Sequence, residues 1–192
     1  MHHIYHTEGI ILSSQNFGEA GKYYSIFTRD LGMVFASAQG IRKMSSKLRF
    51  ILQDFSYAKI DLVKGKDFWI ITSASKTNKL ENLQKPEFLK VFASISKLLK
   101  RLLAGEDVNE ALFADLINGL LVLEKAGTKE EMHNVEAVIV LRILHNLGYI
   151  GGDEMLKDLI VSPFAGDLVF KVSQNRTKVL NQINKALKET HL

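Results

Sequence analysis

The chain has 192 residues, 46% hydrophobic and 24% charged, a composition typical of a globular protein with a buried core. It contains no cysteine, which excludes disulfides, thiolate nucleophiles and thiolate zinc sites. The net charge is a modest +4, no apolar run reaches the ~18 residues of a membrane span, and the N-terminus lacks a signal-peptide pattern. We therefore expect a cytoplasmic protein with no membrane contact.

The first 79 residues are predicted to form β-structure. Short runs rich in aromatic and β-branched residues alternate with turn signals at residues 30–32 and 64–67. The first of these turns predicts a hairpin of the second and third strands. Five short strands favour a small closed barrel, because closure removes exposed strand edges. The predicted strands are residues 7–12, 22–28, 32–38, 55–62 and 68–74.

From residue 80 onward the spacing of apolar residues becomes helical. Pro86 fits the first position of a helix, where its missing N–H costs nothing. Asn109 is placed to cap a second helix, and Thr128 and Glu131 have the spacing of a capping box that opens a third. The three helices are predicted to end at Gly105, Gly127 and Gly148.

Residues 150–175 carry a less regular pattern. Residues 153–159 are predicted to form one or two helical turns, and residues 168–172 a short strand or extended segment. The last helix is predicted to run from about Asn175 to Glu189, with apolar residues on one face.

Positive charge is concentrated in the first 79 residues, where eleven Lys and Arg face six Asp and Glu. Residues 80–192 hold fourteen against fifteen. Such asymmetry favours an anionic partner for the first part, although a basic solvated surface gives the same composition. Residues 40–50, between the third and fourth predicted strands, hold four cations, two serines and no acid. These groups suit phosphate binding; the alternative is a solvated loop that binds nothing specific.

Five aromatic residues lie on predicted strands: Tyr23, Tyr24, Tyr57, Phe68 and Trp69. Rings beside a cationic groove hold single strands by stacking on their bases. Because neighbouring strand residues point to opposite faces, only one of Tyr23 and Tyr24, and one of Phe68 and Trp69, faces outward. Most strand aromatics belong to a core, so each ring is a candidate for either role.

Catalytic and metal-binding patterns are missing from the sequence. His2, His3 and His6 lie at the N-terminus without supporting carboxylates, and His133 and His145 are too far apart to share a metal. There is no Walker loop, GxSxG or HExxH motif, and the acidic residues are scattered. We expect a non-catalytic protein with no metal and no cofactor; an undetected nuclease is the least favoured reading.

Several segments of the sequence match the pattern of one known protein family. They are residues 5–12, 17–22, 27–32, 38–49 and 52–55, with Asp54 where proline is common, and residues 141–149, which end in Leu-Gly-Tyr. Together they resemble the bacterial RecO family of recombination mediators. The resemblance implies an N-terminal OB-fold and a C-terminal helical domain. Many relatives carry a four-cysteine zinc module after the Leu-Gly-Tyr helix, which this chain cannot form.

The resemblance also implies binding of single- and double-stranded DNA, annealing of complementary strands, and help in loading RecA onto strands coated by single-strand-binding protein. The implied partners are RecR and the C-terminal tail of that binding protein, in the cytoplasm and in association with the nucleoid.

We therefore predict an α+β protein with a five-stranded OB-fold barrel in residues 1–79 and an all-helical domain in residues 80–192, acting in recombinational DNA repair. Two other classes stay open: an OB-fold RNA-binding protein, and a protein-interaction adaptor acting through the helical part. The predicted DNA-binding residues are Lys22, Arg42, Lys43, Ser45, Ser46, Lys47, Arg49, Lys64 and Lys66.

Overall fold

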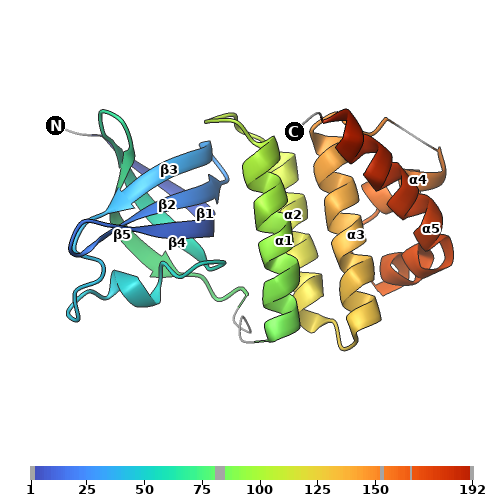
Figure 1. Cartoon of the computed structure of the whole chain (residues 1–192), viewed down its shortest axis with the longest axis horizontal. Helices are drawn as coiled ribbons and strands as arrows, with labels where there is room; N and C mark the ends of the chain where they lie inside the picture. Colours follow the sequence, from blue (N-terminus) through green and yellow to red (C-terminus); the bar gives the residue numbers. More distant parts are fainter. Residues whose placement is uncertain (1–2, 81–84, 152–153, 165, 191–192) are drawn as a thin grey trace. The chain divides into compact units, whose positions relative to one another are not determined.

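The computed structural model describes residues 3–80, 85–151, 154–164 and 166–190 (Figure 1). The chain divides into two compact units. The first, called here the barrel unit, comprises Met1–Leu83 and Leu103–Glu110. The second, the helical unit, comprises Gln84–Leu102 and Ala111–Leu192. The short segment Leu103–Glu110 therefore groups with the barrel, although helices precede and follow it in the sequence.

Five strands close into a barrel in the order β1-β2-β3-β5-β4, which confirms the predicted fold class (Figure 1). Four neighbouring pairs are antiparallel, and the β3–β5 pair, which is parallel, completes the circle. The predicted hairpin is confirmed, since Thr28 on β2 pairs with Gly32 on β3. The strands are β1 (Ile4–Phe17), β2 (Gly21–Thr28), β3 (Gly32–Ala38), β4 (Tyr57–Lys64) and β5 (Trp69–Lys76).

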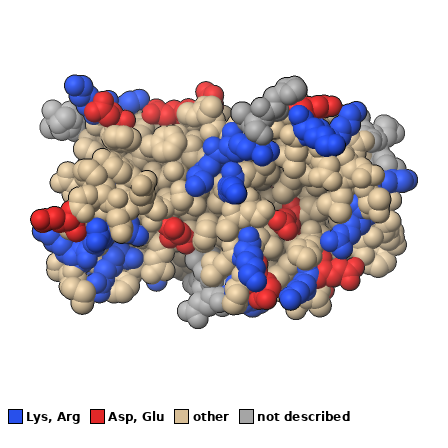
Figure 2. Space-filling view, viewed as in Figure 1, with Lys and Arg blue, Asp and Glu red and all other residues tan. Residues whose placement is uncertain are grey.

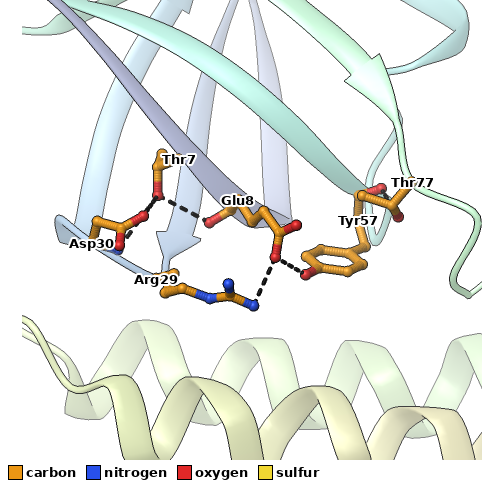
Figure 3. A network of polar contacts seen from close by, with 6 residues as sticks. All are labelled: Thr7, Glu8, Arg29, Asp30, Tyr57 and Thr77. Carbon is orange, nitrogen blue, oxygen red and sulfur yellow. Dashed lines mark hydrogen bonds and ion pairs between the residues drawn. The ribbon is translucent and has the colours of Figure 1, made fainter.

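One end of the barrel is fastened by a network of polar side chains (Figure 3). Thr7 donates to the Asp30 carboxylate at 2.6 Å, and Arg29 lies 2.7 Å from the Glu8 carboxylate. The Tyr57 hydroxyl donates to the same Glu8 carboxylate. Burial and this bond raise the pKa of Tyr57 above its ordinary value, so the phenol keeps its proton and remains a donor. The network ties β1 to β4 and to the turn after β2.

The segment Leu103–Glu110 lies against the β2–β3 turn. The Met33 backbone N–H donates to the Gly105 carbonyl at 3.0 Å. Gly32 has φ +67, and a Cβ built on it would lie 2.4 Å from the Asp107 carbonyl oxygen. Both the left-handed backbone and the close approach therefore require glycine at position 32.

We expect Gly32→Ala to destabilise the barrel unit by roughly 2–4 kcal/mol, because it adds backbone strain and a clash with rigid backbone. Urea unfolding followed by the fluorescence of Trp69, the single tryptophan, measures this. Gly18→Ala is the matched control: Gly18 has φ +53, but no atom lies within 4 Å of its built Cβ. Its cost should be about 1 kcal/mol. Equal costs at the two positions would refute the close approach at Gly32.

Among the described residues, five helices follow the barrel strands, and the first three confirm the predicted helices. Pro86 opens α1, as predicted. The capping box opens α3: the Glu131 N–H donates to the Thr128 hydroxyl at 3.1 Å, and the Thr128 N–H donates to the Glu131 carboxylate at 3.3 Å. Among the described residues, every helix is too short or too polar to cross a bilayer. The helices are α1 (Pro86–Leu102), α2 (Glu110–Lys125), α3 (Lys129–Asn146), α4 (Glu154–Val161) and α5 (Gly166–Glu189).

The prediction for residues 168–172 was wrong: they are helical and belong to α5. Leu168 and Val172 are both buried, and their spacing of four places them on one helical face. Five residues are too few to separate this spacing from strand alternation. The predicted start of the last helix, Asn175, is a kink within α5 with φ −118 and ψ 17. Residues 153–159 were predicted as helical turns; α4 covers all of them except Asp153, which lies outside the described residues.

Candidate nucleic-acid interface

The basic segment lies in the loop between β3 and β4, residues 39–56, and has a defined shape. Ile41 and Leu52, near its two ends, are each 1% exposed and pack into the barrel core. The Arg42 N–H donates to the Ala20 carbonyl at 2.9 Å, which joins the loop to the turn between β1 and β2. The backbone of the loop, which carries the cations, is therefore held in place by the barrel.

Three of its cations, Arg42, Lys43 and Lys47, are exposed. The Arg42 guanidinium donates to the Gly18 carbonyl at 3.3 Å, a neutral partner that leaves its charge uncompensated. Arg49 is different: its guanidinium lies 4.4 Å from the centre of the Phe50 ring and donates to the Met44 sulfur at 3.2 Å. Arg49 is half-buried and packs within the loop.

Ser45 and Ser46 lie in the turn at the tip of this loop. The Ser46 N–H donates to the Lys43 carbonyl at 3.0 Å, which closes the turn. Ser45 is exposed and Ser46 is half-buried. Their hydroxyls therefore lie beside the exposed cations in the chain.

The other three predicted residues lie outside the loop. Lys22 pairs across the sheet with Ala38, next to the start of the loop, and its ammonium donates to the Ser14 hydroxyl at 3.2 Å. Lys64 and Lys66 lie at the turn between β4 and β5, and Lys66 is exposed. The predicted DNA-binding residues therefore lie in two groups, one at the loop after β3 and one at the turn between β4 and β5.

The charge of Lys64 is already compensated. Its ammonium lies 3.1 Å from the Glu106 carboxylate, which also accepts a bond of 2.9 Å from the Trp69 indole N–H. The Trp69 bond, with help from Lys64, holds the pKa of Glu106 below its ordinary value against the opposing effect of desolvation. Lys64 is therefore less available to a phosphate than the cations of the loop.

The structure decides which strand aromatics face outward. Tyr24 is 2% exposed and Trp69 4%, so both belong to the barrel core. Tyr23 and Phe68 point outward, with ring centres 5.0 Å apart. Phe17 extends this pair, since its ring centre lies 4.5 Å from that of Tyr23. Sequence reasoning missed Phe17 because the predicted first strand stopped at residue 12, whereas β1 continues to Phe17.

A groove of about 480 Å³ is lined by Phe17, one of these aromatic residues, and by residues of the basic loop. Phe17 and the turn that follows it form one side, and Gln39, Gly40 and Lys43 form the other. Glu19 also lines the groove. In the view of Figure 2, Lys and Arg side chains gather at the lower left, where the loop after β3 lies in Figure 1. The barrel unit thus combines exposed cations with exposed rings.

The helical unit has a groove of its own, about 820 Å³ in volume, between α1, α3 and α5. Its floor is apolar and includes Leu98, Val140 and Ile183. Cations from α1 and α5 stand at its rim, and Glu136 and His133 also line it. Figure 2 shows a group of Lys and Arg side chains over α1. The rim cations are Lys97, Arg101 and Arg176.

The histidines form no metal site in the part of the chain that the structure describes, where no three His, Asp or Glu side chains gather closely enough to hold an ion. His6 instead lies 2.6 Å from the Asp61 carboxylate, and His145 contacts the Ile150 carbonyl. His2 lies outside the described residues.

A closed five-stranded barrel with this strand order, followed by helices, defines an OB-fold protein with a helical C-terminal part. The family model for the N-terminal part of recombination protein O matches residues 1–80. The chain belongs to the RecO family, as the resemblance of its sequence indicated.

Similar proteins extend the match into the helices. The DNA repair protein RecO of Desulfitobacterium hafniense (strain DSM 10664 / DCB-2) is 25% identical over 183 residues, covering 90% of this chain and 66% of the relative. That of Caldicellulosiruptor saccharolyticus is 27% identical over 136 residues, covering 70% and 56%. That of Dehalococcoides mccartyi (strain ATCC BAA-2100) is 30% identical over 129 residues, covering 67% and 51%. The matched part of the chain spans between half and two thirds of these relatives' length.

Proposed function

We propose that this protein is a DNA-binding recombination mediator that acts in DNA repair. In this proposal it binds single- and double-stranded DNA through the barrel unit, anneals complementary strands and assists the loading of RecA. The observation that carries the proposal is the loop after β3, whose exposed Arg42, Lys43 and Lys47 stand on a support anchored by Ile41 and Leu52. The relatives' name, DNA repair protein RecO, supports the same role.

The chemistry of annealing requires no catalytic group. Two complementary strands repel each other through their phosphates, and cations that neutralise those phosphates lower the repulsion. Contacts to the backbone carry no sequence information and leave base edges free to pair. A loop that offers cations on a fixed frame therefore brings strands together without competing for their bases.

The groove of the helical unit fits the tail of single-strand-binding protein, which the proposal takes as an acidic peptide with apolar residues. Lys97, Arg101 and Arg176 at its rim complement acidic residues, and its apolar floor accepts hydrophobic side chains. This arrangement also favours an adaptor role for the helical unit, as one part of the mediator function. RecR enters the proposal through family membership alone.

Strand annealing with and without bound single-strand-binding protein tests the proposal. We expect the protein to accelerate annealing of both naked and coated strands. Deleting the tail of the binding protein, or changing Lys97 and Arg101 to Glu, should abolish acceleration on coated strands by removing the charge contacts, and leave naked strands unaffected. Lys157→Glu, at an exposed position on α4, is the control.

Two results would contradict this proposal. Failure to accelerate annealing of naked strands would remove the DNA-binding part. Equal loss on naked and coated strands in the Lys97 and Arg101 variant would remove the groove as the tail site. Competition by RNA of the same sequence measures the preference for DNA, because the barrel fold alone does not distinguish the two.

A further inference from the structure

Three aromatic rings stand in a row on the outside of the barrel. Tyr23 from β2 is the middle ring; Phe17, at the end of β1, and Phe68, just before β5, are its neighbours. The ring planes are tilted by 39° and 38°, and the ring centres are 4.5 Å and 5.0 Å apart. The row therefore brings together rings from three different parts of the barrel sequence.

The two end rings are open to solvent while the middle ring is half-covered. Phe17 is 43% exposed and Phe68 46%, whereas Tyr23 is half-buried between them. Single exposed aromatic residues are common, but aromatic side chains that lie together on a surface often mark a binding site. A flat apolar group stacked on either end would extend the row and cover the exposed ring faces.

Each end of the row has a cation nearby. Phe17 and Lys43 line the same groove, beside the turn after β1. Phe68 follows the exposed Lys66 by two residues, in the turn between β4 and β5. An acid also lies near each end, Glu19 in the groove and Asp67 in the turn. Arg42, which is next to Lys43 in the chain, makes the net charge at the Phe17 end positive.

We propose that the row formed by Phe17, Tyr23 and Phe68 stacks unpaired bases and makes the barrel prefer single strands over duplex. This inference rests on the proposed DNA binding and adds to it a base-contacting surface that adjoins the basic loop. A base on Phe17 places its phosphate toward Lys43, and a base on Phe68 places its phosphate toward Lys66. Rings beside a cationic groove are the arrangement that binds single strands without sequence preference.

Duplex DNA cannot use the row in this way, because its bases are already stacked on one another and paired. The basic loop, in contrast, contacts phosphates that both forms of DNA carry. The two surfaces therefore have different expected effects. The loop determines the affinity for both forms of DNA and the salt dependence of that affinity. The row determines how much more tightly the protein binds a single strand than a duplex.

The test compares the unaltered protein with its Phe17→Leu/Phe68→Leu variant. Leucine keeps an apolar side chain at both exposed positions and removes the flat ring. Dissociation constants for a fluorescent oligothymidine strand and for a duplex of equal length are measured by anisotropy. We expect the variant to lose about 10- to 100-fold in affinity for the single strand. Duplex affinity should change by less than about twofold, and the salt slope should stay unchanged.

Phe170→Leu is the matched control, since Phe170 is 66% exposed on α5 and outside the row. It should bind both forms of DNA as the unaltered protein does. Crosslinking of the unaltered protein to a strand containing 5-iododeoxyuridine gives a second readout independent of any variant's folding. We expect the crosslinked peptides to contain Phe17, Tyr23 or Phe68.

The outcomes separate this inference from the proposed function. If the unaltered protein binds neither form of DNA, the proposed function fails and the inference fails with it. If it binds the single strand and the double variant binds equally well, the row is not a base-stacking surface, while the proposed function stands. Equal loss on single strand and duplex, or a loss confined to binding of a partner protein, would also overturn the inference.

Discussion

Changing Arg42 and Lys43 together to Glu is expected to weaken binding of single-stranded DNA on the order of 10- to 100-fold near 0.1 M salt. Both side chains are exposed, and the backbone N–H of Arg42 is bound to the Ala20 carbonyl, which fixes the direction of the loop. The backbone that carries the two cations is thus held in place before any phosphate would bind. Their reversal removes two contacts and adds repulsion in the same place.

The salt dependence gives a sharper readout than affinity alone. Each phosphate contact with a single strand contributes about 0.7 to the slope of log K against log salt concentration. The slope should therefore fall by about 1.4 in the double variant. A filter-binding titration between 50 and 300 mM salt, with about six concentrations, measures both quantities.

Lys59→Glu/Lys76→Glu is the matched control, with the same change of net charge in the same unit. Both residues are exposed, and Lys76 is the last residue of β5, whereas Trp69 at the start of β5 pairs with β3 near the loop. We expect its slope to stay close to that of the unaltered protein. If both double variants lose the same affinity and slope, the protein binds DNA through its overall charge, and the loop is not the site.

Changing Arg142 to Leu is expected to destabilise the helical unit by about 3–5 kcal/mol. Arg142 lies on α3 and its side chain is 4% exposed. Its guanidinium donates to the Leu159 carbonyl at 2.9 Å, to the Asp115 carboxylate at 2.9 Å and to the Ser162 carbonyl. It also lies 4.3 Å from the centre of the Phe164 ring. One side chain therefore links α3 to α2, to α4 and to the segment after α4.

Leucine at this position would leave Asp115 Oδ1 and two carbonyl oxygens without the Arg142 donor, although Asp115 Oδ2 keeps its bond from Asn146, and this is why the expected loss is large. Urea unfolding followed by far-UV circular dichroism reports on the helices. Arg142→Lys keeps the charge but loses the fork of donors, so an intermediate loss is expected.

The matched control is Lys171→Ala, which removes the 2.9 Å pair with Asp158 between α5 and α4. The two side chains of that pair are 50% and 71% exposed, so solvent screens their attraction and the expected loss is below about 1 kcal/mol. Similar losses for Arg142→Leu and Lys171→Ala would show that the buried guanidinium does not hold the helices together.

The bonds of Arg142 show how this chain, which has no cysteine, stabilises the region after the Leu-Gly-Tyr motif. Residues 154–164 form α4 and the segment behind it, and Arg142 bonds to the carbonyls of Leu159 and Ser162 within this stretch. Polar bonds from α3 therefore anchor the stretch in the absence of thiolate ligands. Arg142 was visible in the sequence only as part of the family resemblance, because nothing local marks an arginine as buried.

Local signals in the sequence determined the secondary structure wherever they were strong. Alternation of apolar residues and the turn signals located all five strands. Pro86 and the capping box of Thr128 and Glu131 located the starts of two helices, because backbone geometry and caps depend on neighbouring residues alone. At residues 168–172 the spacing of apolar residues was compatible with both a strand and a helix. In the structure the segment is helical, and Leu168 and Val172 are buried on one face of it.

The candidate site was predictable in part. The sequence located the basic loop between the third and fourth strands and limited Tyr23 or Tyr24, and Phe68 or Trp69, to one outward ring each. The choice within each pair depends on which strand face packs inside the closed barrel, and closure through the parallel β3–β5 pair joins residues far apart in the chain.

The sequence by itself determined the family, the barrel followed by helices and the position of the cationic loop. Only the tertiary structure decided that Ile41 and Leu52 anchor that loop, that Glu106 compensates Lys64, and that Phe17 completes a row with Tyr23 and Phe68. The physical reason is distance along the chain. Alternation, capping and turn geometry act between near neighbours, whereas the contacts of Glu106 with Lys64 and of Phe68 with Tyr23 join residues more than forty positions apart, and Phe17 meets Tyr23 only because β1 extends to the turn before β2.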